Sequence, residues 1–153
     1  MNAYVKRDLY LNRLIVRRDN GQIKAVTGPR RSGKSFLLDP IYKDYLLSKG
    51  VPEDNIIIIS FDIEDEDTPQ ELLDREKLKE YLYSRIASQT ENYYVFLDEI
   101  QEVDGFERIV NGLNKHQNVD VYVTGSNSKF LSSEINTIFR GRSDEVCVLP
   151  FTF

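Results

Sequence analysis

The chain has 153 residues, enough for one domain with a sizeable core, and 41% of them are hydrophobic, as in ordinary globular proteins. Its formal net charge of -5 at pH 7 disfavours non-specific binding of the whole domain to duplex nucleic acid. No apolar run approaches the roughly 18 residues that a membrane span needs, and the N-terminus lacks a signal-peptide core. We therefore expect no membrane partner and a cytoplasmic location.

From the N-terminus onwards, segments of helical spacing alternate with strand-like apolar segments. We expect Pro40 to kink the second helix, Gly50 to end it, and Pro69 to lie in the first turn of the third. In chain order, the expected elements are a helix at residues 6–18, a strand at 22–27, a helix at 34–50, a strand at 55–62, a helix at 67–88, a strand at 93–99, a helix at 105–117, a strand at 119–125, a helix at 128–139 and a strand at 144–150.

Five strands that alternate with helices predict an α/β fold, in which a mostly parallel sheet lies between layers of helices. No repeat, low-complexity tract or linker divides the chain, so we expect residues 1–153 to form one domain with 1–20 as a helical lead-in. The chain stops at "LPFTF", three residues after the last expected strand. We therefore expect it to be a domain excised from a longer protein.

The single cysteine and the single histidine offer little chemistry. Cys147 cannot form an internal disulfide, and its place in the strand-like "EVCVL" predicts a small buried hydrophobic side chain. His116 has no second ligand at metal-binding spacing and is expected at the surface end of a helix. The almost wholly acidic run at 62–67 is expected to be a solvated face.

The segment "GPRRSGKS", residues 28–35, fits the pattern G-x-x-x-x-G-K-[ST] between an expected strand and an expected helix. Glycines let successive backbone N–H groups point at phosphate oxygens. Lys34 would reach the β- and γ-phosphates, and the Ser35 hydroxyl would bind Mg²⁺. For Arg30 and Arg31, a solvated role and a contact with phosphate or a partner both remain open. The expected nucleotide-binding residues are Gly28, Pro29, Arg30, Arg31, Ser32, Gly33, Lys34, Ser35 and Phe36.

A carboxylate pair follows the third expected strand, in "YYVFLDEIQ". Asp98 is expected beside the phosphate loop, where it would hold Mg²⁺ through water. Glu99 could accept a proton from an attacking water, which favours hydrolysis, or it could merely cap the following turn.

The fourth expected strand ends in "TGSNS". Thr124, Ser126 and Asn127 are candidates for a polar group that contacts the γ-phosphate, and Asn127 is preferred because its amide both donates and accepts. Ordinary turn chemistry at a strand end also explains this segment.

The set "GPRRSGKS", "FLDEIQEVDGFE", "VTGSNSKFLSSEI", "FRGR" and "LPFTF" resembles the AAA-type ATPases of bacteria and archaea, in particular a group usually fused to a C-terminal nuclease-like domain. The resemblance covers nearly the whole chain. It implies ATP and Mg²⁺ as ligands. The sequence has no guanine-specific N-K-x-D motif, and the preference for adenine over guanine comes mostly from the resemblance. It also implies a P-loop NTPase sheet with strand order 5-1-4-3-2. In the family a helical lid and an effector domain follow, and we expect both to be absent from this sequence.

In such ATPases an arginine–glycine–arginine region lies at the subunit edge and can reach a neighbour's nucleotide. Arg140 and Arg142 in "FRGRSD" match it, which implies a homo-oligomer joined at this edge. The alternative is an ordinary solvated helix end with Gly141 as its stop.

The residues predict an ATPase with Lys34, Glu99 and Asn127 in its chemistry, and the resemblance adds Arg140 and Arg142. Two other functions stay open: a nucleotide-gated binding module with negligible turnover, and a phosphotransferase for a small acceptor. The second would need an acceptor pocket, and no arginine-rich substrate arm is evident. The sequence does not identify the effector, protein or nucleic acid on which the nucleotide cycle acts.

Overall fold

The computed structural model describes residues 3–30, 32–64, 66–126, 130 and 132–149. Its centre is a sheet of five strands in which every neighbouring pair is parallel. The strands are β1 (Ile23–Thr27), β2 (Ile56–Ser60), β3 (Tyr93–Asp98), β4 (Val119–Thr124) and β5 (Ser143–Cys147). Their spatial order is β2-β3-β4-β1-β5, so the predicted order 5-1-4-3-2 is confirmed, read from the other edge.

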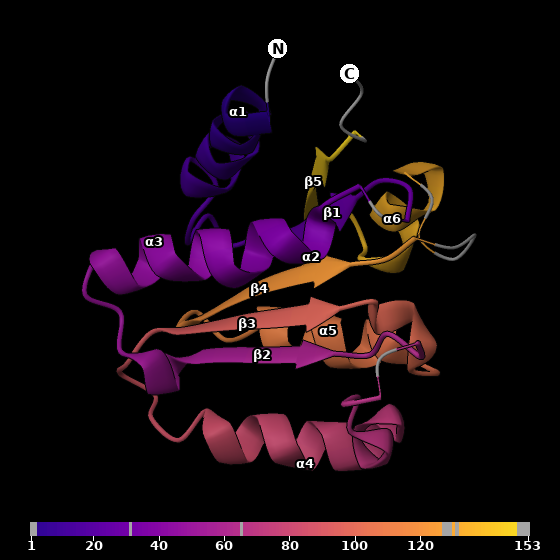
Figure 1. Ribbon diagram of the computed structural model, residues 1–153. Coiled ribbons are helices and arrows are strands. Elements are labelled where there is room, and N and C mark those ends of the chain that lie inside the picture. The colour runs from indigo at the N-terminus through magenta and orange to yellow at the C-terminus, as the bar shows by residue number, and fades with distance from the viewer. Residues whose placement is uncertain (1–2, 31, 65, 127–129, 131, 150–153) are drawn as a thin grey trace.

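Helices cover both faces of the sheet (Figure 1). One face carries α1 (Ala3–Ile15) and a helical segment that runs through α2 (Lys34–Phe36), η1 (Leu37–Tyr42) and α3 (Lys43–Ser48). The other face carries α4 (Arg75–Arg85), α5 (Phe106–Asn114) and α6 (Ser132–Ile138). Three short 3-10 turns complete the described elements: η2 (Glu53–Asn55), η3 (Gln70–Leu73) and η4 (Ile100–Glu102).

The alternation of side chains along each strand creates two hydrophobic layers. In β3, Val95 and Leu97 pack on the side of α4 and α5, whereas Tyr94 and Phe96 pack on the side of α1 and α3. Because both faces are buried, the strands are apolar almost throughout. All parallel strands end at the same edge of the sheet, and the segment between β1 and α2 lies at that edge (Figure 1).

The expected kink at Pro40 is confirmed, since Asp39 before it has φ -136° and ψ 111° and is not helical. The expected helix at 67–88 begins later than predicted. The Asp74 carboxylate accepts a hydrogen bond of 3.1 Å from the Lys77 N–H, so Asp74 is the N-cap and α4 starts after it. Residues near Pro69 instead form the separate turn η3.

The predicted burial of Cys147 is wrong, because its side chain is exposed. β5 is an edge strand, and the inward positions at this end are Val146 and Val148, which are 1% and 2% exposed. The period of two therefore turns Cys147 outward. His116 lies at the surface just after α5, as expected, and its Nε2 is 3.3 Å from the Tyr83 hydroxyl.

A buried polar cluster joins the turn after α1 to the amino end of the sheet. Lys24 on β1 is fully buried and forms an ion pair with Asp120 on β4. The Asp120 carboxylate also accepts from the Asp19 N–H at 2.9 Å and from the Tyr122 hydroxyl at 2.6 Å. Burial raises the pKa of Asp120, and the Lys24 charge opposes that shift. The lead-in segment is thus fixed to the core at the sheet edge opposite the carboxyl ends.

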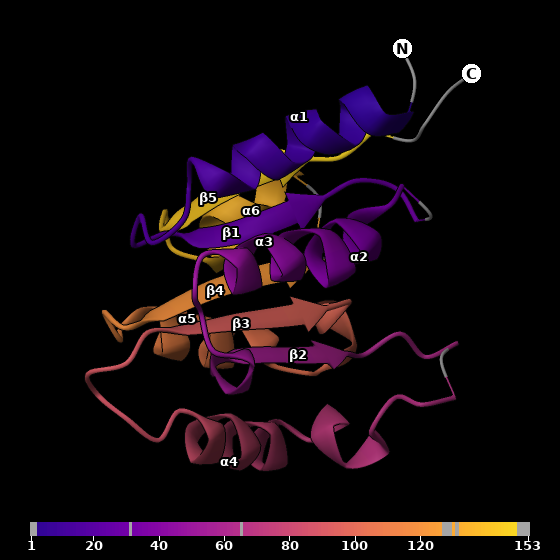
Figure 2. The same cartoon turned by 60° about the vertical axis from the view of Figure 1, so that its left-hand side comes forward.

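The N-terminal helix also contacts the segment that follows β5 (Figure 2). The Tyr10 hydroxyl accepts a hydrogen bond of 3.1 Å from the Leu149 N–H, and Arg17 forms a 3.0 Å ion pair with Asp144.

Among the described residues, no helix has the length and apolarity that crossing a membrane requires.

Candidate functional site

The phosphate loop joins β1 to α2 and depends on two glycines with positive φ. Gly28 has φ 142° and Gly33 has φ 95°, a backbone region that side chains strongly disfavour. A Cβ at Gly28 would lie 2.1 Å from the Val148 carbonyl oxygen, so the chain after β5 packs directly against the loop. The Val148 N–H donates to the Thr27 carbonyl at 2.7 Å, which fixes this contact.

Lys34 lies under the loop, only 4% exposed. Its amine donates to the carbonyl oxygens of Gly28 at 2.7 Å and Pro29 at 2.9 Å. Burial lowers the pKa of Lys34, and the nearby carboxylates of Glu99 and Asp98 oppose that shift. The loop therefore holds a buried amine at its centre with carboxylates close by.

Ser35 and Asp98 meet directly. The Ser35 hydroxyl lies 2.9 Å from Asp98 Oδ1 and 2.8 Å from Oδ2. The Thr124 hydroxyl donates to Oδ1 at 2.6 Å, and Ser60 lies 3.4 Å from Oδ2. Asp98 is 8% exposed, so hydroxyls from α2, β2 and β4 surround a nearly buried carboxylate.

Glu99 follows with φ 55°, a left-handed conformation that costs energy for any residue except glycine. Its N–H donates to the Thr124 hydroxyl at 2.9 Å. The Ser126 hydroxyl lies 3.0 and 2.9 Å from its two carboxylate oxygens, and the Gln101 amide donates to Oε2 at 2.8 Å. The strained backbone and these donors orient the carboxylate beside the loop.

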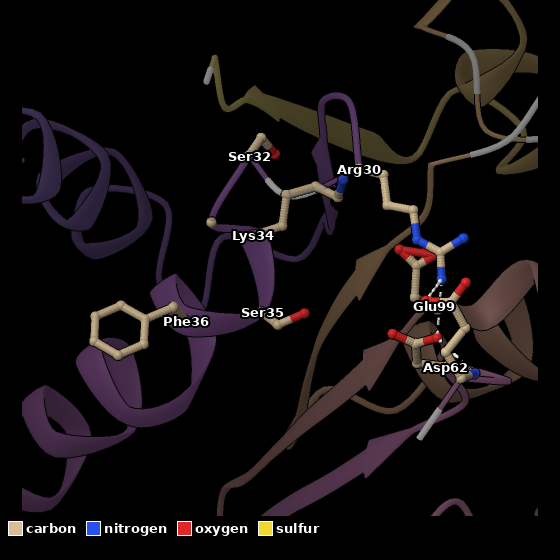
Figure 3. Close-up of a pocket in the computed structure, with 9 residues that line it drawn as sticks. Arg30, Ser32, Lys34, Ser35, Phe36, Asp62 and Glu99 are labelled. Carbon is tan, nitrogen blue, oxygen red and sulfur yellow. Dashed lines mark hydrogen bonds and ion pairs between the residues drawn. The ribbon is translucent and has the colours of Figure 1, made fainter. Parts of the chain in front are cut away.

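Arg30 extends from the loop towards Asp62 and Glu99 (Figure 3). Its Nη2 atom lies 3.2 Å from Asp62 Oδ1 and 3.1 Å from Glu64 Oε2. Thus the start of the acidic run faces the site, while Ile63, Glu64, Glu66 and Asp67 are exposed, as expected for a solvated face. A cleft of about 360 Å³ opens between these groups, lined by Arg30, Ser32, Gly33, Lys34, Ser35, Phe36, Asp62, Glu64 and Glu99.

The described residues fit a phosphate ester and a magnesium ion. The Ser32 hydroxyl is buried and finds no hydrogen-bond partner in the described part of the chain. The glycine conformations leave the loop backbone open to a close ligand. Ser35 and Asp98 supply the oxygen donors that Mg²⁺ prefers. Within the described ranges no group of three or more histidine, cysteine or acidic side chains is placed to hold a metal ion.

The other expected site residues are placed less centrally or lie outside the described residues. Arg31 and Asn127 are among the latter. Phe36 is 57% exposed, and its ring points away from Arg30 and Asp62 (Figure 3). Arg140 and Arg142 are both exposed and precede β5. The Arg142 carbonyl accepts from the Ile23 N–H at 2.7 Å, so both arginines lie towards the amino end of β1, away from the phosphate loop.

Sequence reasoning missed Asp62 and Gln101. Asp62 comes two residues after β2, and the convergence of parallel strand ends could have indicated its place. The Gln101 contact with Glu99 depends on the turn η4, and no local sequence pattern predicted this turn.

Comparison with known proteins gives one family and two long relatives. A family described as "AAA domain" matches residues 20–153. A protein of Haemophilus influenzae is 37% identical over 151 residues, which are 99% of this chain and 37% of that protein. A protein of Methanocaldococcus jannaschii is 37% identical over 133 residues, 86% of this chain and 27% of that protein. The match thus spans 37% of the length of the first relative and 27% of the length of the second.

Solved structures with a similar fold share little sequence. Drosophila ORC bound to AT-rich DNA and Cdc6 has a TM-score of 0.64 at 10% identity and covers 97% of this chain and 58% of that one. PCH-2 of C. elegans has a TM-score of 0.62 at 15% identity, over 96% of this chain and 42% of that one. A DNA replication initiation factor has a TM-score of 0.56 at 18% identity, and the match covers 90% of this chain and 43% of that one. These likenesses concern the fold.

Proposed function

Because the chain belongs to the family of AAA domains and has the P-loop NTPase fold, we propose that it binds ATP with Mg²⁺ and hydrolyses the γ-phosphate. In this proposal the nucleotide cycle drives a partner or a further domain. The relatives are much longer than this chain. The partner or further domain on which the nucleotide cycle acts is therefore part of the proposal, and we assign it no identity.

Each side chain at the carboxyl edge has a role in this proposal. The loop backbone and Lys34 bind the phosphates, and the Lys34 amine exchanges its two carbonyl partners for phosphate oxygens. Ser35 and Asp98 hold Mg²⁺, which would offset the charge of the phosphates. Glu99 orients the attacking water and accepts its proton.

The observation that carries the proposal is the arrangement of Asp98 and Glu99. The first carboxylate meets the loop hydroxyl of Ser35, and the second is oriented towards the same cleft by Ser126 and Gln101. Small-molecule kinases with such a loop usually need no second carboxylate, because their substrate brings the hydroxyl. Hydrolysis therefore accounts for Glu99 better.

Glu99→Gln tests the proposal, since an amide cannot take a proton. We expect ATP and Mg²⁺ binding to persist while phosphate release slows by about 10²-fold or more. Glu80→Gln, at an exposed position of α4 away from the cleft, is the matched control. Wild-type turnover by Glu99→Gln would contradict the general-base role.

One observation favours the second candidate, a nucleotide-gated binding module with negligible turnover. The Glu99 carboxylate already accepts hydrogen bonds from the Ser126 hydroxyl and the Gln101 amide, and a base held in this way is less available to water. A single-turnover measurement separates the two: the module would hold ATP without releasing phosphate.

A further inference from the structure

Arg30 is held at one atom by two carboxylates. Both ion pairs, to Asp62 at 3.2 Å and to Glu64 at 3.1 Å, involve Nη2. Among the described residues, the Nε and Nη1 atoms of Arg30 have no hydrogen-bond or ion-pair partner. Such an edge binds a phosphate through two parallel hydrogen bonds.

Asp62 is itself anchored to the strand ends that carry the site. Its carbonyl accepts from the Thr68 hydroxyl at 2.6 Å, and its Oδ1 accepts from the Glu64 N–H at 3.0 Å. The preceding Phe61 N–H donates to the Asp98 carbonyl at 2.9 Å. The carboxylate is therefore fixed relative to Asp98, which a mobile surface acid would not be.

Exposure distinguishes the three partners. The side chains of Arg30, Asp62 and Glu64 are 53%, 35% and 67% exposed. Ion pairs this exposed contribute little to stability. The two ion pairs of Arg30 therefore do not explain the arginine by a gain in the stability of the fold. Asp62, the better buried and better anchored partner, sets where the guanidinium lies.

We propose that Asp62, assisted by Glu64, positions Arg30 to bind the terminal phosphate of a nucleoside triphosphate, and that Arg30 thereby distinguishes the triphosphate from the diphosphate. This rests on the proposed function. Lys34 lies at the base of the loop, whereas Arg30 reaches to the side of Glu99, where the phosphate under attack would be (Figure 3). A diphosphate has no group there.

The test measures ATP and ADP affinities by calorimetry, with Mg²⁺ present, and compares their ratio among variants. Arg30→Gln should lower the preference for ATP over ADP by about tenfold or more and leave ADP affinity within about twofold. Asp62→Asn should act in the same direction with a smaller effect. The double variant should be no worse than Arg30→Gln alone, because both changes remove one interaction.

Arg108→Gln and Asp44→Asn are matched controls, since both residues are exposed and lie away from the cleft. Thermal unfolding checks that each variant is folded. Equal loss of ATP and ADP affinity in Arg30→Gln would contradict the inference, because it indicates a general electrostatic effect. A higher preference for ATP in Asp62→Asn would also contradict it, because the carboxylate would then compete with phosphate.

The two proposals fail in different ways. If the wild-type chain bound neither nucleotide, the proposed function would be wrong and the inference with it. If it bound ATP and the ratio were unchanged in Arg30→Gln, only the inference would be wrong.

Discussion

The Ser35 hydroxyl donates to the Asp98 carboxylate, 2.9 Å from Oδ1 and 2.8 Å from Oδ2. This contact joins the first turn of α2 to the last residue of β3. It brings the two oxygen donors expected for Mg²⁺ into one place although they are far apart in the sequence. This contact is the structural basis for proposing that Ser35 and Asp98 hold Mg²⁺.

Asp98→Asn should remove the metal-dependent part of nucleotide binding, because an amide is a much poorer ligand for Mg²⁺ than a carboxylate. We expect wild type to bind ATP at least about tenfold more tightly with Mg²⁺ than without it, and the variant to lose that difference. Calorimetry with and without EDTA measures it. Asp44→Asn is the control, and a normal Mg²⁺ effect in Asp98→Asn would rule out this ligand.

Asp120→Ala should destabilise the domain by about 3–5 kcal/mol, because it leaves the fully buried Lys24 charge without its partner. Urea unfolding measures the free energy. The double variant Lys24→Met/Asp120→Leu should recover part of the loss, since no buried charge remains. A loss below about 1 kcal/mol in Asp120→Ala would show that water or another group satisfies Lys24.

Arg140→Ala/Arg142→Ala should lower turnover without lowering ATP affinity if these arginines act on a neighbouring subunit. Such fingers contribute about 10³-fold or more in related P-loop enzymes. Phosphate release per chain should rise with protein concentration in wild type. Mixing this variant with Lys34→Ala should restore part of the activity, because each protein carries what the other lacks. No recovery in a co-assembled, folded mixture would exclude the arginines from the chemistry.

Much of the fold was predictable because its signals are local. The apolar runs of β2 and β3 and the glycine spacing of residues 28–35 each need only a short window of sequence. The kink at Pro40 follows from its missing N–H. The order of the strands was implied by the family resemblance, since spacing alone allows others.

The errors concern features that depend on contacts between distant segments. Cys147 was predicted as buried from the strand pattern, but on the edge strand β5 the buried positions at this end are Val146 and Val148, and Cys147 between them is exposed. Asp62 was assigned to a solvated face, although the sheet brings it opposite Arg30 from another loop. Asp74 follows the turn η3 and is the N-cap of α4. The sequence alone did not show that the helix starts after Asp74 and not near Pro69.

The central claim is that the loop around Lys34 binds nucleotide phosphate, and calorimetric titration of ATP with Mg²⁺ into wild type and Lys34→Ala tests it most directly. Circular dichroism verifies the fold, and Lys79→Ala serves as an exposed lysine control. We predict that wild type and the control bind ATP, while Lys34→Ala binds about tenfold or more weakly, a loss of at least ~1.4 kcal/mol. Undiminished ATP affinity in folded Lys34→Ala would contradict the account.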